Sequence, residues 1–198
     1  GANAAQQNAI AIGFDAEATA INSIVLGART LPTAGATAES AIAIGTDVTA
    51  SATDAIAIGR QSHASGLRST ATGAYSIAGH TQASAFGYMA NASGLESTAI
   101  GYDAVATGVN ATALGNQVHA LADGSIAIGT NNAGDHVDAT STNGISIGFW
   151  SKVTNAPSGL AMGDRASTNA QNGIAIGTNS ISSGIAAIAM GTNANADT

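Results

Sequence analysis

The sequence contains no cysteine and only two prolines, and aromatic and charged side chains are scarce. Without cysteine the chain can form neither a disulfide nor a thiolate-ligated metal site. Aromatic residues make up 4% of the 198 residues and charged residues 9%. A core built from this composition must be thin and must consist mainly of isoleucine and alanine. That is typical of a rolled, repetitive structure and not of a compact enzyme domain.

Basic residues are also scarce, and they are scattered along the chain. The net charge is −7, with five basic residues in all. Recognition of nucleic acid or of an anionic membrane surface needs clustered lysine and arginine, so neither partner is expected. Residues 166–196 carry no charge, but they are rich in Asn, Gly, Ser and Thr and therefore do not read as a membrane span.

What the sequence has in abundance is one short motif. NAIAIG (8–13) recurs as SAIAIG, DAIAIG, GSIAIG, NGISIG and NGIAIG, and each copy ends in glycine. Of the twelve gaps between successive closing glycines, nine are 14 residues long, and the others are longer by four, five and one. The closing glycines are Gly13, Gly27, Gly45, Gly59, Gly73, Gly87, Gly101, Gly115, Gly129, Gly148, Gly163, Gly177 and Gly191. A fixed period of this kind identifies a repeat architecture.

Each repeat reads as two short strands joined by turns. Apolar, small and apolar residues alternate before the glycine, which is the period of a strand. Small residues alternate again after it, and glycine suits the turns. The chain is therefore predicted to be all-β, a parallel β-roll (solenoid) of about 13 coils stacked about 4.8 Å apart. The isoleucines are expected to point into the roll.

If the isoleucines point inward, the alanine between them faces outward. This column would form a flat apolar strip, and such a strip usually marks an interface. It predicts a homotrimer whose symmetric closure hides the strip; the alternative is that alanine simply suits a strand surface. The predicted interface residues are Ala11, Ala43, Ala57, Ala71, Ala85, Ala99, Ala113 and Ala127.

Several middle repeats depart from the pattern. Hydroxyl residues replace isoleucine at Thr70, Ser84, Thr98 and Thr112, and Thr72 precedes a closing glycine. Because buried hydroxyls need partners, this section is expected to have a more polar interior and looser packing.

The motifs NSIVLG, GSIAIG and NGIAIG, at a 14-residue period, resemble the head repeats of trimeric autotransporter adhesins of the YadA-like type. The resemblance covers residues 8–198 and implies a left-handed, homotrimeric β-roll. It implies one repeat head domain, 1–198, cut from a longer protein whose stalk, neck and membrane anchor lie elsewhere. The head would lie on the outer membrane surface of a Gram-negative bacterium, without direct membrane contact.

The resemblance also implies a non-catalytic role. The head would attach the cell to a host extracellular-matrix protein such as collagen, or to abiotic or cell surfaces. Collagen-type ligands are associated with the repeated motif, which begins here at Asn8, Asn22, Asn143 and Asn172.

No residue pattern indicates catalysis, a cofactor or a metal site. His63 and His119 share a repeat position but lie four coils apart, about 19 Å at the ladder spacing, too far to share an ion. Asp15, Asp47 and Asp103 each follow a closing glycine by two residues, where aspartate caps its own backbone in a turn. Three copies of one histidine on a trimer axis remain an alternative to plain surface histidines.

The insertions are the best candidates for a ligand site, because solenoids extrude extra residues as loops. They fall within 28–40, within 130–144 and beside 149–159. A contact patch is predicted around the single tryptophan and the second loop. Its residues are Phe149, Trp150, Lys152, Asp135, His136 and Asp138.

A monomeric ice-binding or glycan-binding β-solenoid is the alternative function, although threonines do not repeat at one position along the stack, as ice binding needs. Acyltransferases of the left-handed β-helix type have a period of six, and 14 is not a multiple of six.

Overall fold

A computed structural model describes residues 1–130 and 136–197 of the chain. It divides into two compact units, residues 1–96 (unit 1) and 97–198 (unit 2). Every regular element in the described ranges is a β-strand. None of the described residues belongs to a helix long and apolar enough to cross a lipid bilayer.

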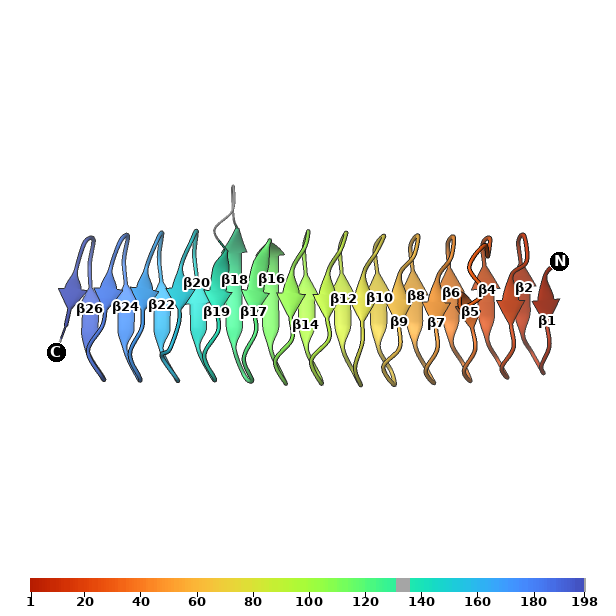
Figure 1. The fold of residues 1–198 in the computed structure, drawn as a ribbon, viewed down its shortest axis with the longest axis horizontal. Coiled ribbons are helices and arrows are strands. Elements are labelled where there is room, and N and C mark those ends of the chain that lie inside the picture. Colours follow the sequence, from red (N-terminus) through yellow and green to blue (C-terminus); the bar gives the residue numbers. More distant parts are fainter. Residues whose placement is uncertain (131–135, 198) are drawn as a thin grey trace. The chain divides into compact units, whose positions relative to one another are not determined.

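In unit 1 the strands alternate between two parallel sheets (Figure 1, red to yellow). The even-numbered strands carry most of the isoleucines, and we call their sheet the isoleucine sheet. They are β2 (Ile10–Ile12), β4 (Ile24–Leu26), β6 (Ile42–Ile44), β8 (Ile56–Ile58), β10 (Thr70–Thr72) and β12 (Ser84–Phe86). The odd-numbered strands form what we call the polar sheet. They are β1 (Asn3–Ala4), β3 (Glu17–Ala18), β5 (Gly35–Ala36), β7 (Thr49–Ala50), β9 (His63–Ala64), β11 (Ile77–Ala78) and β13 (Asn91–Ala92).

Unit 2 repeats the arrangement, and its strands also alternate between an isoleucine sheet and a polar sheet (Figure 1, green to blue). The strands of its isoleucine sheet are β14 (Thr98–Ile100), β16 (Thr112–Asn116), β18 (Ile126–Thr130), β20 (Ile145–Ile147), β22 (Leu160–Met162), β24 (Ile174–Ile176) and β26 (Ile188–Met190). The strands of its polar sheet are β15 (Val105–Ala106), β17 (Val118–Ala120), β19 (Val137–Ala139), β21 (Lys152–Val153), β23 (Ser167–Thr168), β25 (Ile181–Ser182) and β27 (Asn195–Ala196).

The pairing register follows the glycine spacing. Ile42 pairs with Ile56, 14 residues on, whereas Ile24 pairs with Ile42 across the four-residue insertion. Ile126 pairs with Ile145 across the five-residue insertion, and Ile145 pairs with Leu160 across the single extra residue. Each coil therefore aligns equivalent positions of the repeat, and the insertions leave the ladder unchanged. The predicted all-β parallel solenoid with a 14-residue repeat is confirmed.

The predicted orientation of the isoleucine strands is wrong. The alanine between the two isoleucines points inward, and its neighbours point outward. Seven of the eight alanines assigned to a trimer interface are at most 1% exposed: Ala43, Ala57, Ala71, Ala85, Ala99, Ala113 and Ala127. Ala11, on β2, is half-buried. The seven buried side chains have no surface with which to contact another subunit.

The reason is volume. The polar sheet also turns small residues inward, such as Ala18, Ala50 and Ala106, all with no exposed surface. Two sheets lined with alanine and serine lie too close together for isoleucine, and the largest fully buried side chains are Val118, Val137 and Val153. Alternation in a strand defines two faces but does not say which face is inside. The close-packed interior selects the small one.

The expected polar interior of the middle repeats is wrong for the same reason. Thr70, Thr72, Ser84, Thr98 and Thr112 flank the inward alanines and lie on the outward, half-buried face. The inward side of the same strands is alanine, as in most of the other coils.

The closing glycines are required where one coil stacks on the next. Gly101 has φ +134°, and a Cβ added there would lie 1.9 Å from the carbonyl oxygen of Gly115. No side chain fits such a contact. The turns also hold non-glycine residues at positive φ, among them Asn8 at 58° and Asp103 at 53°. Asparagine and aspartate tolerate this left-handed region better than most residues.

Candidate functional site

The predicted contact patch lies in unit 2, and its aromatic part is a stacked group that we call the tryptophan cluster (Phe149, Trp150 and Arg165). The rings of Phe149 and Trp150 are stacked with centroids 4.6 Å apart. The Arg165 guanidinium carbon lies 4.6 Å from the Trp150 ring centroid, which is a cation–π distance. Both aromatic rings are half-buried.

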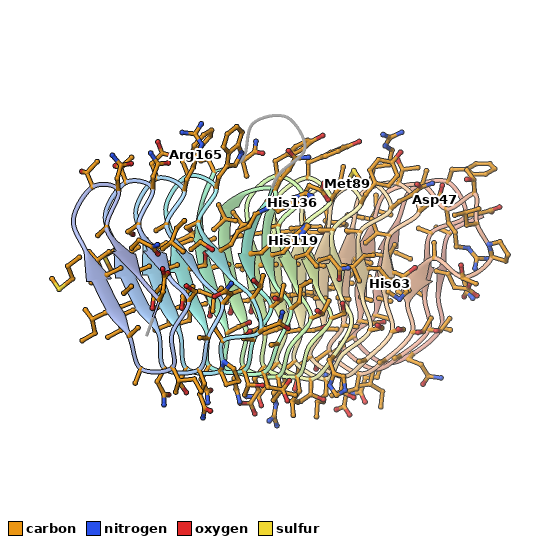
Figure 2. The ribbon with its side chains drawn as sticks, turned by 60° about the vertical axis from the view of Figure 1, so that its left-hand side comes forward. Asp47, His63, Met89, His119, His136 and Arg165 are labelled. Atoms are coloured by element: carbon orange, nitrogen blue, oxygen red, sulfur yellow. The ribbon has the colours of Figure 1, made fainter. Side chains whose placement is uncertain are left out.

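The backbone positions these side chains through the repeat. Trp150 and Arg165 both lie at φ 55° in the turn that follows a closing glycine. They occupy the same place on successive coils, since Arg165 N–H donates to the Phe149 carbonyl oxygen at 2.8 Å. The guanidinium is thereby held over the ring of the preceding coil. Figure 2 labels Arg165 at this edge of the unit.

A second group, which we call the histidine pair, is made by His119 and His136 with Asp138. The imidazole rings are stacked, with centroids 3.9 Å apart and planes 26° apart. Nδ1 of His119 lies 3.3 Å from Oδ1 of Asp138, and Nδ1 of His136 is 3.2 Å from the Gln117 carbonyl oxygen. Because a carbonyl oxygen only accepts, the His136 ring donates there. Figure 2 shows the two labelled histidines lying close to each other.

Lys152 lies next to the histidine pair on the polar sheet. His119, Asp138 and Lys152 pair in register on neighbouring strands β17, β19 and β21. Their side chains point outward, because the residues that follow them, such as Ala139 and Val153, are fully buried. The outward row therefore presents an imidazole, a carboxylate and an ammonium group on three successive strands. Asp135, the remaining predicted member, lies outside the described residues.

The sequence pattern missed His119 and Arg165 as members of this site. His119 was paired with His63, which lies on β9 in unit 1. The signal was present in the insertions, since five extra residues place Asp138, and not residue 133, opposite His119. One extra residue likewise places Arg165 opposite Trp150. Aligning the repeats with the insertions removed would have found both contacts.

The chemistry of this site is that of a contact surface. In the described residues, no group of three or more His, Cys, Asp or Glu is arranged to hold a metal ion. Stacked rings, a guanidinium and an outward row of mixed charge offer flat apolar area next to hydrogen-bond donors and acceptors. Such a combination favours binding an extended polymer across the surface over binding a small molecule in a cavity.

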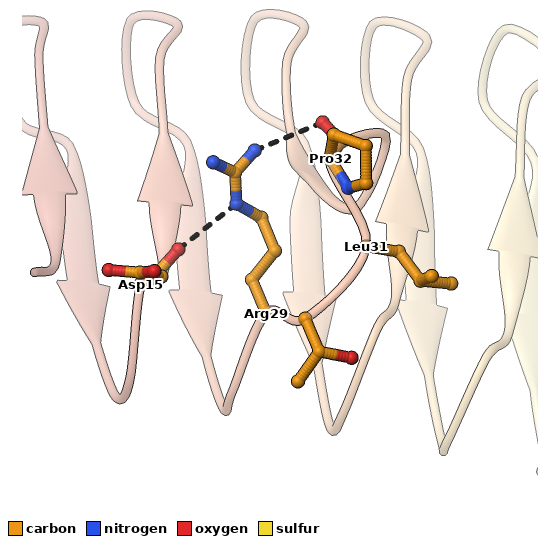
Figure 3. A pocket seen from close by; sticks show the side chains of 5 residues that line it. Asp15, Arg29, Leu31 and Pro32 are labelled. Atoms are coloured by element: carbon orange, nitrogen blue, oxygen red, sulfur yellow. Dashed lines mark hydrogen bonds between the residues drawn. The ribbon is translucent and has the colours of Figure 1, made fainter.

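The first insertion builds a second feature, in unit 1. Figure 3 shows a shallow pocket lined by Asp15, Arg29, Leu31 and Pro32, together with Thr30. Arg29 donates to the carbonyl oxygens of Asp15 at 3.1 Å and Pro32 at 3.0 Å, and it pairs with Glu17. The pocket holds about 190 Å³, below the roughly 300–1,000 Å³ of most ligand sites. Arg29 therefore acts as a brace for the loop.

Asp47 secures the same loop from the next coil. Its carboxylate accepts hydrogen bonds from the Thr30 N–H at 2.6 Å, the Thr30 hydroxyl at 2.7 Å and the Leu31 N–H at 2.9 Å. These bonds, the one from the Thr30 N–H first, lower the pKa of Asp47 below its ordinary value. The predicted turn position is right, with φ 54°, but the carboxylate caps the inserted loop and not its own backbone.

The asparagines that begin the repeated motif are turn residues. Asn8, Asn22, Asn143 and Asn172 all have φ between 54° and 59°. Nδ2 of Asn8 donates to Oδ1 of Asn22 on the next coil at 3.0 Å. Their recurrence is explained by the backbone alone.

The fold is a parallel β-solenoid with small residues inside and its aromatic, charged and larger apolar side chains outside. The sequence matches the family described as YadA head domain repeat (2 copies). The matched residues are 4–30, 50–76, 81–104, 106–132, 155–180 and 182–198. The chain therefore belongs to the YadA head family, a family of bacterial cell-surface adhesins. No curated protein matches the sequence significantly.

Proposed function

We propose that this chain is the head of a trimeric autotransporter adhesin. Three copies associate through their isoleucine sheets and present their polar sheets to the surroundings. The head is displayed beyond the outer membrane of a Gram-negative bacterium. It attaches the cell, without catalysis, to a host extracellular-matrix protein such as collagen or to abiotic and cell surfaces. Membership of the YadA head family supports this proposal.

The outward face of the isoleucine sheet is the observation that carries the trimer. Its strands contain no charged residue in the part of the chain that the structure describes. Large apolar side chains on it remain exposed in the single chain, including Phe86, Ile100, Leu114 and Met162 at 39–41%. An exposed, largely apolar face of this kind marks an interaction surface. Closed rotational symmetry covers it completely, with no face left for uncontrolled association.

The proposed trimer interface therefore moves from the alanines to their neighbours. The side chains that flank each buried alanine, such as Ile56 and Ile58 around Ala57, replace it as subunit contacts. The polar sheets, with Glu17, Asp138 and Lys152 facing outward, then stay in contact with solvent.

The first test is the solution mass of the chain with a matched pair of variants. Light scattering is expected to give three times the 19.0 kDa chain mass. Ile100→Lys, at 39% exposure on the isoleucine sheet, places a charge in the interface and is expected to dissociate the trimer. Ile77→Lys, at 40% exposure on the polar sheet, is expected to leave it intact. A monomeric wild-type chain would overturn the proposed trimer. The function to test would then be that of a monomeric ice-binding or glycan-binding solenoid.

The ligand-contacting surface that we propose combines the tryptophan cluster with the histidine pair and Lys152. Aromatic and arginine side chains dominate the energetics of protein interfaces. In a symmetric trimer each weak contact occurs three times, and avidity multiplies the affinity without any new contact. Collagen, as an extended polymer, can engage several copies at once.

Trp150→Ala tests this surface. The variant is expected to reduce binding to collagen-coated surfaces about tenfold or more, corresponding to a loss of about 1.4 kcal/mol. Tyr88→Ala is the control, because Tyr88 is a turn aromatic in unit 1 that packs edge-on against Tyr75 at 5.8 Å. Solution mass and circular dichroism of both variants confirm that they fold. Equal binding by the two variants would remove the tryptophan cluster from the proposed surface.

A further inference from the structure

The apolar face of the isoleucine sheet is interrupted by hydroxyl groups in each unit. In unit 1, Thr70 and Thr72 on β10 and Ser84 on β12 replace the aliphatic residues of the preceding coils. In unit 2, Thr98 on β14 and Thr112 on β16 do so before the column returns to isoleucine at Ile126 on β18. We call these five residues the hydroxyl steps.

The hydroxyl steps make no hydrogen bond from their side chains to any residue that the structure describes. All five are half-buried on the outward face. Several inward serines are bonded within the chain: the Ser23 hydroxyl donates to the Ala20 carbonyl oxygen at 2.7 Å, and Ser76 donates to Gly73 at 2.8 Å. The buried hydroxyls of Ser69 and Ser125 have no partner among the described residues, but they point into the roll. The hydroxyl steps differ from both groups because their free donors and acceptors face outward.

A repetitive apolar face poses a problem of register for any assembly built on it. Sliding one copy by a single coil, about 4.8 Å, moves Ile42 to the height of a partner's Ile56. The buried apolar area is nearly unchanged by such a slip, because isoleucine again meets isoleucine. Since the hydrophobic effect is non-directional, the free energy of association changes little as well. Isoleucine ladders alone therefore do not distinguish the aligned trimer from slipped ones.

We propose that the hydroxyl steps fix the axial register of the three chains; this inference rests on the proposed trimer. Three equivalent hydroxyls brought to one height by three-fold symmetry form a closed ring. Each group donates one hydrogen bond and accepts one, which is within the capacity of a hydroxyl. A slip by one coil places Thr70 against Ile56 and Thr72 against Ile58. Thr112 then faces Ile126 at the other end of the run. The steps between the two ends meet another hydroxyl, but Thr70, Thr72 and Thr112 lose their partners while remaining desolvated, which is unfavourable.

A further copy of this chain is the occupant that best fits the steps. Any other partner needs its own hydroxyl groups at matching heights, whereas an identical copy supplies them by construction. In this β-sheet interface the hydroxyl steps play the part that a single buried asparagine plays in a coiled coil, where it selects the alignment of the helices. It specifies alignment and does not supply the main affinity.

The absence of cysteine allows a direct test by disulfide trapping. One chain carries Ile44→Cys and a size tag, and a second, untagged chain carries Ile58→Cys. These positions are paired neighbours on β6 and β8. Co-expressed, aligned trimers give tagged–tagged and untagged–untagged disulfides, whereas trimers slipped by one coil give the mixed species. The mixed species is identified by its intermediate mass on a non-reducing gel.

Removing the hydroxyls should release the register. Thr70→Val, Thr72→Val, Ser84→Ala, Thr98→Val and Thr112→Val, combined in both trapping chains, are expected to raise the mixed fraction about tenfold at unchanged trimer mass. Substituting only the three steps of unit 1 should give a smaller rise. The matched control places the same kinds of change away from the isoleucine sheet, at Thr37, Thr49, Thr107 and Thr140 (to Val) and at Ser65 (to Ala), and should leave the mixed fraction low.

The outcomes separate this inference from the function on which it rests. A wild-type chain that is not a trimer overturns both. If the wild-type chain is a trimer but the variant with all five substitutions keeps the wild-type disulfide pattern, the register inference alone is overturned. A similar rise in the control variant also overturns it, because the effect would then not belong to the isoleucine sheet.

Discussion

The two sheets of each unit are made from the same repeat and look alike from the inside, yet they differ in charge on the outside. Both turn alanine and serine inward, with exposures near zero. Outward, the isoleucine sheet shows apolar and hydroxyl side chains without charge, whereas the polar sheet also shows Glu17, His63, Asp138 and Lys152. The interior therefore needs only small volumes, and the outward residues are free to specialise. One sheet is suited to its own copies and the other to solvent and ligand.

The largest loss of stability is expected when an inward residue is replaced by the isoleucine found at its outward neighbours. Ala57→Ile turns the β8 sequence into three isoleucines, and the buried site has no room for the added volume. Overpacking is expected to lower the free energy of unfolding by about 3 kcal/mol. Thr49→Ile, outward on β7, should change it by less than about 0.5 kcal/mol. Urea denaturation of both variants makes the comparison, and equal effects would contradict the assigned interior.

A second contrast concerns the turns that connect the sheets. Gly101→Ala brings a Cβ within 1.9 Å of a backbone oxygen at φ +134°, and it is expected to lower stability by about 2–3 kcal/mol. Gly79→Ala is the control, since its nearest neighbour would be 3.5 Å away at an ordinary φ. That change is expected to be neutral or stabilising by about 0.4–1 kcal/mol. Thermal unfolding followed by circular dichroism distinguishes the two.

A third prediction tests the cation that lies over the single tryptophan on the outside of unit 2. Arg165→Ala is expected to lower stability by about 0.5–1 kcal/mol and to change the tryptophan fluorescence, because the ring loses its cover. Arg60→Ala is matched to it, with its guanidinium carbon 4.7 Å from the Tyr75 ring. This control should leave the tryptophan emission unaltered. An unchanged spectrum in Arg165→Ala would contradict the stacking.

The smallest expected effect is local and depends on pH. The pKa of Asp47 is lowered in the folded chain from an ordinary 3.8, chiefly by the hydrogen bond from the Thr30 N–H. Its contribution is therefore complete above pH 3.8 and is lost as the pH falls through the lower folded pKa. Asp47→Asn should speed proteolysis within residues 28–34 at neutral pH, and the difference from wild type should fade in acid. Asp103→Asn, at the same turn position, should not affect this loop.

The architecture could be predicted from the sequence because it depends on period. The spacing from Ile42 to Ile56, or across the insertion from Ile126 to Ile145, defines both the coil and the ladder. The turn positions of Asp47 and Asp103 follow from the same count. Register in a solenoid is a local property, so a one-dimensional pattern contains it.

What the period does not contain is which face is inside, and that is where the prediction for Ala57 and Ile58 was wrong. The answer depends on the volume offered by the opposite sheet, which is a three-dimensional property. The site was predicted in part for a related reason. Trp150 and His136 stood out by type, whereas Arg165 and His119 became neighbours only through the lengths of the insertions.

The ladder that absorbs four, five or one extra residues without losing register has a genetic consequence. Each coil is an interchangeable module of 14 codons, so unequal recombination between two repeats deletes or duplicates whole coils and restores the same inward alanines. Changes of any other length are displaced into a turn. Among descendants of one such gene, the number of coils can therefore change in a single genetic step. The contacts between stacked coils remain the same.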